Sequence, residues 1–244
     1  MTKIFLDTAS MKEIEKYKSW GIIQGLTTNQ KIFLKEKGCN FKQRAQEILN
    51  EIDPLPVSLE GPNDFKGILE AAADYGSWSN DEGKPFENIV IKVPMMGNGE
   101  GLKAVKALNE KFVKTNVTAC MTLNQTFLAA SAGATYVSLF YNRMKDWYKE
   151  TYPSTNNTIG NDEVYALETI AQTQVMLKLH GFKTKLIIGS IREPEDIESI
   201  LKVHPDIITI PPKILEQMPF NDKTESTLND FEEAWKEFKK YESK

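Results

Sequence analysis

The sequence predicts an α/β fold, a (β/α)8 or TIM barrel that forms a single domain over residues 1–244 and ends in an extra helix. Two observations support this prediction. Eight short strand-like runs alternate with longer helical patterns along the whole chain. The length of 244 residues also suits this barrel, which typically takes about 250 residues as one domain.

The main alternative is an open, doubly wound parallel sheet. That fold calls for a glycine-rich dinucleotide turn after its first strand. The segment in that place, Asp7-Thr8-Ala9-Ser10, is not such a turn. The barrel is therefore the preferred prediction.

The expected strands are short, apolar and rich in β-branched residues. They cover residues 3–7, 22–27, 56–60, 88–94, 115–120, 135–139, 185–190 and 207–210. The run from Asn88 to Pro94 is the clearest of them, because it is β-branched and is closed by a proline. Such runs are typical of parallel strands that are buried on both faces.

Helical patterns fill the gaps between these strands. They cover residues 10–20, 41–52, 64–75, 99–111, 124–132, 164–179 and 194–202. Ser10 stands three residues before Glu13, which is the spacing of a capping box. Asn124 is a favourable N-cap residue, and Pro194 stands near a helix start.

A last amphipathic helix is expected at about residues 227–241. Its apolar positions are Leu228, Phe231, Trp235 and Phe238. This face packs either on the barrel of the same chain or on a neighbouring subunit. Two polar segments, 78–85 and 151–158, are expected as surface insertions. The second follows the sixth strand and is therefore expected to shape a substrate entrance.

Composition argues against several classes of protein. The net charge is -4 and there is no basic stripe, so nucleic acid is not expected as a partner. No apolar stretch approaches the roughly 20 residues of a membrane helix. The chain enters its first strand at once and leaves no room for a signal peptide. Two cysteines, Cys39 and Cys120, are too few for a disulfide framework, and a cytoplasmic location is expected.

Metal chemistry is not expected either. The two histidines, His180 and His204, lie in no Cys/His cluster and form no part of a recognisable Ser-His-Asp triad. Acid–base work in an enzyme of this composition falls to carboxylates, lysine, tyrosine or water. No cofactor is predicted.

Lys92 is the most informative residue, because it lies inside the apolar run 88–94. Burial disfavours the charged form of a lysine and so favours a neutral, nucleophilic amine. Such an amine attacks carbonyl groups to form a Schiff base. The alternative is an edge strand with Lys92 in water, and the run alone does not decide between the two.

Polar residues occur at most of the expected strand ends, where barrel enzymes carry their catalytic groups. In chain order they are Asp7, Thr27, Thr28, Asn29, Glu60, Lys92, Asn116, Thr118, Ser138, Ser190 and Arg192. Each has an ordinary explanation as a cap, a turn residue or a surface charge. In a barrel they surround one mouth, where Arg143 and Arg192 offer paired donors for a phosphate or similar anion, and Ser190 adds a hydroxyl.

At these positions the sequence resembles the transaldolases. The matching segments occur in order over almost the whole chain: 5–9 (FLDTA), 25–29 (GLTTN), 57–60 (VSLE), 89–94 (IVIKVP), 114–118 (KTNVT), 132–138 (AGATYVS), 190–192 (SIR) and 210–213 (IPPK). The length is similar to the short transaldolases and the fructose-6-phosphate aldolases, which share the barrel. The short members often assemble as pentamers or decamers, so the resemblance implies a homo-oligomer.

The resemblance implies a role for each matching residue. Lys92 would be the Schiff-base lysine. Glu60 would be a general acid/base acting through a water held by Thr118, and Asp7 would assist proton transfer at the carbon–carbon bond. The implied substrate contacts are Thr28, Asn29, Asn116, Ser138, Phe140, Arg143, Ser190 and Arg192. The implied substrates are sugar phosphates of the kind used in the pentose phosphate pathway.

Two positions distinguish the transaldolase branch from the aldolase branch of the family that this sequence resembles. The aldolase branch has glutamine where Glu60 stands and tyrosine where Phe140 stands, so both residues favour a transaldolase. The Tyr141 hydroxyl lies next to this position in the sequence. An aldolase that releases free dihydroxyacetone and a non-catalytic sugar-phosphate sensor are the alternatives.

The chain also departs from the family pattern. Gln30 replaces the proline of the usual Thr-Thr-Asn-Pro turn, the run at 119–123 differs, and the tract 145–161 is longer than in the shortest members. These departures leave the substrate open. A sulfonate in place of the distal phosphate, as in 6-deoxy-6-sulfofructose, is a further alternative.

Overall fold

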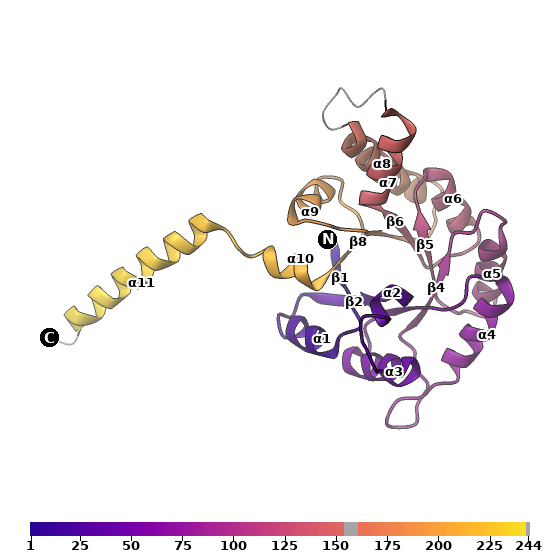
Figure 1. Cartoon of the computed structure of the whole chain (residues 1–244), viewed down its shortest axis with the longest axis horizontal. Helices are drawn as coiled ribbons and strands as arrows, with labels where there is room; N and C mark the ends of the chain where they lie inside the picture. Colours follow the sequence, from indigo (N-terminus) through magenta and orange to yellow (C-terminus); the bar gives the residue numbers. More distant parts are fainter. Residues whose placement is uncertain (154–160, 243–244) are drawn as a thin grey trace.

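The computed structural model describes residues 1–153 and 161–242. Its centre is a closed barrel of eight parallel strands in sequence order, as predicted (Figure 1). The strands are β1 Lys3–Asp7, β2 Ile23–Thr27, β3 Val57–Glu60, β4 Ile89–Pro94, β5 Thr115–Cys120, β6 Tyr136–Phe140, β7 Lys185–Gly189 and β8 Ile207–Ile210. Each end lies within one residue of the predicted one.

Helices surround the barrel at all of the predicted places. They are α1 Met11–Lys18, α3 Phe41–Ile52, α4 Phe65–Gly76, α5 Glu100–Asn109, α6 Leu123–Ser131, α8 Asn161–Leu179 and α9 Pro194–Leu201. Three further helices lie outside the predicted elements: α2 Gln30–Phe33, α7 Tyr141–Thr151 and α10 Pro212–Gln217. Two of these, α2 and α7, lie just after the C-terminal ends of β2 and β6.

Two of the predicted helix starts differ from the structure: the capping box expected at Ser10 does not form, and Asn124 is not the cap of its helix. Ser10 precedes α1, but its side chain makes no capping hydrogen bond. The Glu13 carboxylate instead accepts a hydrogen bond from Thr8 Oγ1, which accepts one from the Ser10 N–H at 3.1 Å. Thr122 caps α6 in place of Asn124, which lies inside the helix. Ser10 is thus the N-cap residue of α1 by position only, whereas Thr122 caps α6 through its side chain.

The interior of the barrel is apolar at its N-terminal end. Phe5, Ile187 and Ile207 form a buried cluster there, with Tyr136 packed against it. Gly25 is required at this level, because a Cβ atom would come within 2.6 Å of the Phe5 ring. This apolar cluster fills the N-terminal end of the barrel interior, and the polar residues lie toward the C-terminal end.

Strand register brings the central site residues together. Glu60 on β3 pairs with Lys92 on β4, and Lys92 pairs with Asn116 on β5. Paired residues of parallel strands point to the same side of the sheet. Lys92 is 6% exposed and lies between two strands of a closed barrel, so the edge-strand alternative is wrong.

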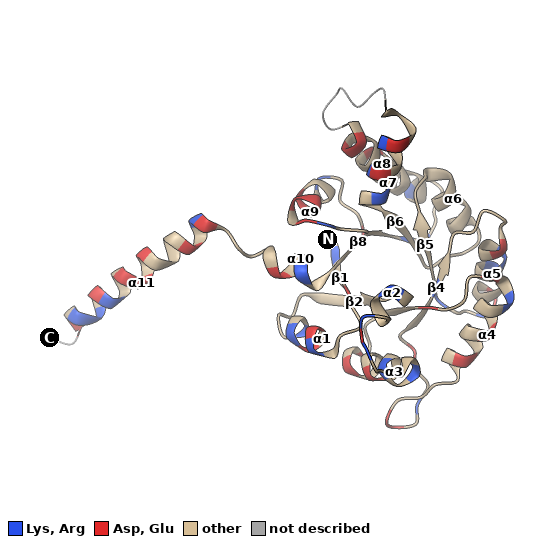
Figure 2. Ribbon diagram, in the orientation of Figure 1, with Lys and Arg blue, Asp and Glu red and all other residues tan. Residues whose placement is uncertain are grey.

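The extra helix is confirmed as α11, which spans Asp222–Glu242 and begins earlier than predicted. It extends away from the barrel as a separate arm (Figure 1), and none of its residues is buried. Acidic and basic residues occur along its whole length (Figure 2). The exposed side chains of Leu228, Phe231, Trp235 and Phe238 are therefore not covered by the barrel of the same chain.

The two expected insertions have different outcomes. In segment 78–85, Ser79 and Pro85 form an isolated antiparallel bridge, but Trp78 is buried against Tyr75 and belongs to the core. Most of segment 151–158 lies outside the described residues. Within the described ranges, no helix has the length and apolarity to cross a membrane, and no group of three or more His, Cys, Asp or Glu side chains is placed to hold a metal ion.

Candidate active site

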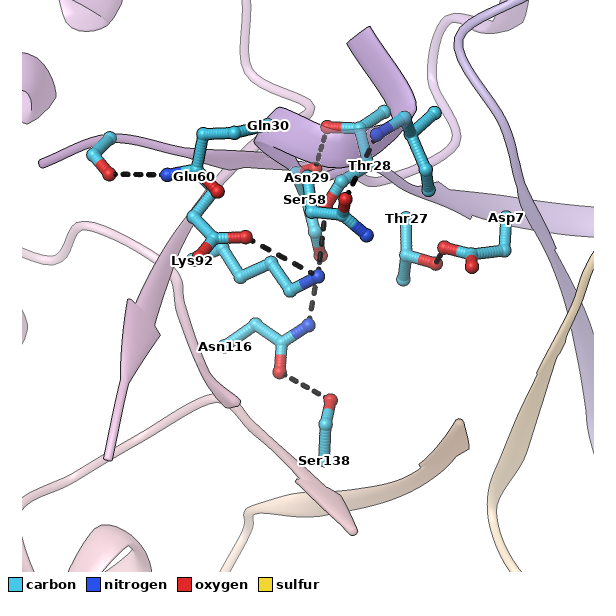
Figure 3. Close-up of polar contacts among 12 residues, drawn as sticks. Asp7, Thr27, Thr28, Asn29, Gln30, Ser58, Glu60, Lys92, Asn116 and Ser138 are labelled. Carbon is cyan, nitrogen blue, oxygen red and sulfur yellow. Dashed lines mark hydrogen bonds and ion pairs between the residues drawn. The ribbon is translucent and has the colours of Figure 1, made fainter. Parts of the chain in front are cut away.

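The Lys92 amine lies at the mouth of the barrel between two oxygen partners. Its Nζ donates a hydrogen bond to the Thr28 carbonyl at 2.8 Å and lies 3.8 Å from Glu60 Oε2 (Figure 3). The Lys92 side chain is 7% exposed and that of Glu60 is 13% exposed. The sequence prediction that places a lysine beside a carboxylate at the strand ends is therefore matched by the geometry.

Lys92 lines a polar cavity of about 180 Å³ at the C-terminal ends of the strands. The lining residues are Asp7, Thr27, Asn29, Lys92, Thr118, Ser138, Phe140, Arg143, Gly189, Ser190 and Thr209. Eight of these are predicted site residues, whereas Thr27, Gly189 and Thr209 are not. Thr209 is an interior position of β8, and alternation along that strand was the signal that could have found it.

Asp7 is fixed within this cavity by Thr27. Thr27 Oγ1 donates to Asp7 Oδ1 at 2.7 Å, and the same hydroxyl pairs with the hydroxyl of Thr209. Loss of solvent raises the pKa of Asp7, while the charge of Lys92 and the hydrogen bond from Thr27 lower it; the net direction is upward. The Asp7 carboxyl is thus more ready to accept a proton than an exposed aspartate.

Glu60 faces Lys92 but does not line the Lys92 cavity; it lines a second cavity instead. That cavity has a volume of about 510 Å³ and is largely apolar, with Phe33, Phe41 and Tyr75 in its wall. Burial raises the pKa of Glu60, and the charge of Lys92 opposes this shift. The carboxylate therefore stands between the Lys92 amine on one side and an apolar wall on the other.

Two residues that were predicted to contact the substrate form hydrogen bonds within the protein instead. Asn116 is fully buried; its Nδ2 donates to Ser58 Oγ at 3.1 Å, and its Oδ1 accepts from Ser138 Oγ at 2.7 Å (Figure 3). Thr28 Oγ1 donates to the Ser58 carbonyl at 2.7 Å. Neither Asn116 nor Thr28 lines the Lys92 cavity. Ser58 is not a predicted site residue, although it shares the inner face of β3 with Glu60.

The Thr118 hydroxyl is available to a bound molecule. Its Oγ1 is buried and has no hydrogen-bond partner among the described residues. It lines the same cavity as Lys92. Asn29 also lines this cavity, and its Oδ1 accepts from the Ile32 N–H at 3.0 Å, so Asn29 caps α2 as well.

One end of the cavity carries a cationic group. Arg143 lies over the Phe140 ring, with 5.8 Å from its guanidinium carbon to the ring centroid. Ser190 has a left-handed backbone conformation, with a φ of 63°. Its carbonyl accepts a hydrogen bond from Asn142 Nδ2 at 2.9 Å, which ties the end of β7 to α7. Arg143 and Ser190 both line the cavity.

Arg192, the other predicted anion contact, does not line the cavity. Its Nη1 donates to Asp146 Oδ1 at 2.9 Å, and its Nη2 binds Asp146 Oδ2. The Arg192 side chain is 54% exposed. Its backbone N–H donates to the buried Asp196 carboxylate at 2.8 Å, which fixes the loop after β7. Arg143 and Ser190 thus line the same cavity, whereas Arg192 is paired with Asp146.

Comparison with known proteins identifies the family. The sequence model of the family described as Transaldolase/Fructose-6-phosphate aldolase matches residues 4–244. The chain belongs to this family. A probable transaldolase of Petrotoga mobilis is 34% identical over 240 residues, which cover 98% of this chain and 97% of that protein. Probable transaldolases of Carboxydothermus hydrogenoformans and Clostridium botulinum are each 37% identical, over 239 and 242 residues, and cover 98% and 97% of this chain and 100% of both relatives.

Position 140 of this member of the transaldolase/fructose-6-phosphate aldolase family carries a phenylalanine, whose ring has no hydroxyl. Phe140 lines the cavity in this chain. The neighbouring Tyr141 is fully buried, and its hydroxyl donates to Glu163 Oε1 on α8 at 3.3 Å. The Tyr141 hydroxyl is therefore bound by α8, and Tyr141 does not line the cavity.

Proposed function

We propose that this protein is a transaldolase that transfers a dihydroxyacetone unit through a Schiff base at Lys92. The donor is a ketose phosphate, such as fructose 6-phosphate or sedoheptulose 7-phosphate, and the acceptor is an aldose phosphate. The observation that supports this most is the buried Lys92 amine, 3.8 Å from Glu60 and in the same cavity as Asp7. No cofactor takes part in the proposed reaction.

The first step needs a neutral amine. Glu60 is placed to take a proton from Lys92, and its raised pKa favours that transfer. The Lys92 nitrogen then attacks C2 of the ketose, and the resulting carbinolamine loses water to give an iminium ion. The proton taken by Glu60 leaves with that water. Thr118 Oγ1, buried and without a partner among the described residues, supports a role in holding the water.

The second step breaks the bond between C3 and C4. The iminium withdraws the electron pair of that bond, while Asp7 removes the proton of the C4 hydroxyl. An aldose phosphate leaves, and an enamine stays on Lys92. The enamine then attacks the carbonyl carbon of the acceptor, Asp7 returns the proton, and water releases the new ketose. The reaction involves no net oxidation or reduction, and the water lost in forming the iminium is taken up again on release.

The cationic end of the cavity is the proposed site of the distal anion. Arg143 and Ser190 line it and offer a guanidinium and a hydroxyl. Both a phosphate and a sulfonate would accept these hydrogen bonds. A donor comparison between fructose 6-phosphate and 6-deoxy-6-sulfofructose, each with the same acceptor, decides between these substrates.

Borohydride trapping tests the mechanism. Reduction in the presence of fructose 6-phosphate should add the mass of a dihydroxyacetone unit at Lys92, as read by peptide mass spectrometry. An unmodified Lys92 in the folded, donor-treated protein would refute the proposal. The Lys92→Met variant should show no turnover, whereas Glu60→Gln should turn over slowly and still be trapped. A sensor would bind sugar phosphate after Lys92→Met but show no turnover in the wild type.

Transfer is proposed over simple aldol cleavage because of Phe140. An apolar ring beside the enamine supplies no proton to quench it, so the enamine persists until an acceptor arrives. Release of free dihydroxyacetone, measured with and without an aldehyde acceptor, separates the two activities. Release that does not depend on the acceptor would identify an aldolase.

The proposed assembly is a homo-oligomer, a pentamer or decamer, that forms through α11. The exposed apolar side chains of this arm, among them Phe231 and Trp235, favour burial against another copy of the chain. The proposed location is the cytoplasm, where free thiols such as those of Cys39 and Cys120 persist.

A further inference from the structure

Gln30 takes the place of the proline in the usual turn of the family, and its side chain makes a specific contact. It is the first residue of α2, and its Nε2 donates to the Gly61 carbonyl at 2.8 Å (Figure 3). Gly61 directly follows Glu60 in the chain. This hydrogen bond therefore links the start of α2 to the backbone that carries the proposed acid/base residue.

Side-chain donors hold two successive carbonyls at this point. The Tyr75 hydroxyl donates a hydrogen bond to the backbone carbonyl of Glu60 at 3.2 Å, and Gln30 Nε2 donates one to the backbone carbonyl of Gly61. Gly61 is also confined on its other side, since a Cβ atom there would come within 2.8 Å of Ala71 Cβ. The backbone after β3 is thus fixed between α2 and α4, and Gln30 is the α2 contact.

Gln30 also acts on the Glu60 carboxylate itself. The nearby polar side chain of Gln30 lowers the pKa of Glu60, against the larger upward effect of burial. Both residues line the apolar cavity of about 510 Å³. In such surroundings, loss of a polar partner favours the protonated carboxyl.

We propose that Gln30 is a positioning residue that holds Glu60 within reach of Lys92. The proposal rests on the proposed function, in which Glu60 exchanges protons with Lys92. Gln30 does not line the Lys92 cavity, so it acts through Glu60 and not on the substrate.

Gln30→Pro is the sharpest variant, because it removes the side-chain donor with little change to the backbone. Proline is favoured at the first position of a helix, where the N–H has no intrahelical partner. Asn29 continues to cap α2 through the Ile32 N–H. Gln30→Ala is the second variant. The matched control is Gln43→Ala, which removes an exposed amide that binds Glu47 on α3.

The kinetic test compares pH profiles. Gln30→Pro should lower kcat about tenfold, a modest part of what a general acid/base contributes. The acid limb of the kcat profile should move to higher pH, while the KM of the donor should change by less than about twofold. In a Glu60→Gln background, Gln30→Pro should cause no further loss, because the two residues act as one unit. An equal loss in that background, or an unshifted acid limb, overturns the proposal.

A second readout does not need turnover. Carbon-13 NMR of protein labelled at the glutamate carboxyl, with Glu60→Gln to assign the signal, measures the pKa of Glu60 directly. It should rise in both Gln30 variants and stay unchanged in Gln43→Ala. A Glu60 pKa that is the same in wild type and in both Gln30 variants overturns the proposal. A failure of borohydride trapping in the wild type would refute the transaldolase mechanism and leave this measurement valid.

Discussion

The guanidinium of Arg192 is bound by the carboxylate of Asp146, with both terminal nitrogens engaged. The hydrogen bond from Arg192 lowers the pKa of Asp146, and the charges of Lys149 and Arg143 add to this effect. Asp146 is therefore an anion that is paired with Arg192 and is influenced by the charge of Arg143. A substrate phosphate would have to compete with it for Arg192.

Removal of the Asp146 charge should strengthen binding of an anionic donor. For Asp146→Asn we expect the KM of fructose 6-phosphate to fall by up to about fivefold, since exposed ion pairs are worth up to about 1 kcal/mol. The KM of the neutral donor dihydroxyacetone should not change. Asp162→Asn, which removes the partner of Lys149, is the control. A rise in KM would mean that Asp146 orients Arg192 for the substrate.

Arg143 should matter more than Arg192 for the distal anion. Arg143 lines the cavity, whereas Arg192 lies outside its lining and is paired. We expect Arg143→Ala to raise the KM of a phosphorylated donor about tenfold or more, the value of a charge-assisted hydrogen bond. Arg192→Ala should have a smaller effect. Steady-state kinetics with phosphorylated and neutral donors measure both, and a reversed order would contradict the geometry.

Asp7 should lower the stability of the fold at neutral pH. Its folded-state pKa is raised, so the folded protein binds the proton more tightly than the unfolded chain. The free energy of unfolding therefore falls as the pH rises from the unfolded-state pKa of Asp7 to its folded-state pKa. Above the folded-state pKa it falls no further on account of Asp7. Asp7→Asn should be more stable than wild type at pH 7, and equal to it at acid pH. Urea unfolding across this range checks the difference, and a gap that does not change with pH would refute it.

The α11 arm should set the assembly state and not the stability of the barrel fold. None of its residues is buried in the chain. A chain that ends at Asn221 should therefore keep the far-ultraviolet signal of the barrel and lose assembly mass in light scattering.

Point variants provide a milder form of this experiment. Phe231→Asp should weaken the assembly, whereas Lys236→Ala, which removes a partner of Glu232 on the same helix, should not. An assembly mass that is unchanged by truncation would show that another surface joins the subunits.

The places where sequence and structure differ share a physical cause. Thr28 directly follows β2, whereas Asn116 is the second residue of β5, and the side chains of both bind Ser58. Strand alternation tells which side of the sheet a residue faces. It does not tell which neighbour takes a donor, because that depends on atoms from other strands. The helix α7 was not predicted, although it buries Tyr141, Asn142 and Met144.

Local pattern in the sequence by itself determined the barrel, the place of its strands and the clustering of Lys92, Glu60 and Asp7 at one mouth. Hydrophobic period and strand count suffice for this, because closure of a parallel barrel brings all C-terminal strand ends together. Tertiary structure alone decided that Arg192 pairs with Asp146, that the Tyr141 hydroxyl faces Glu163, and that Gln30 holds the backbone after Glu60. These are contacts between side chains from different elements, and their geometry depends on how the helices pack around the barrel.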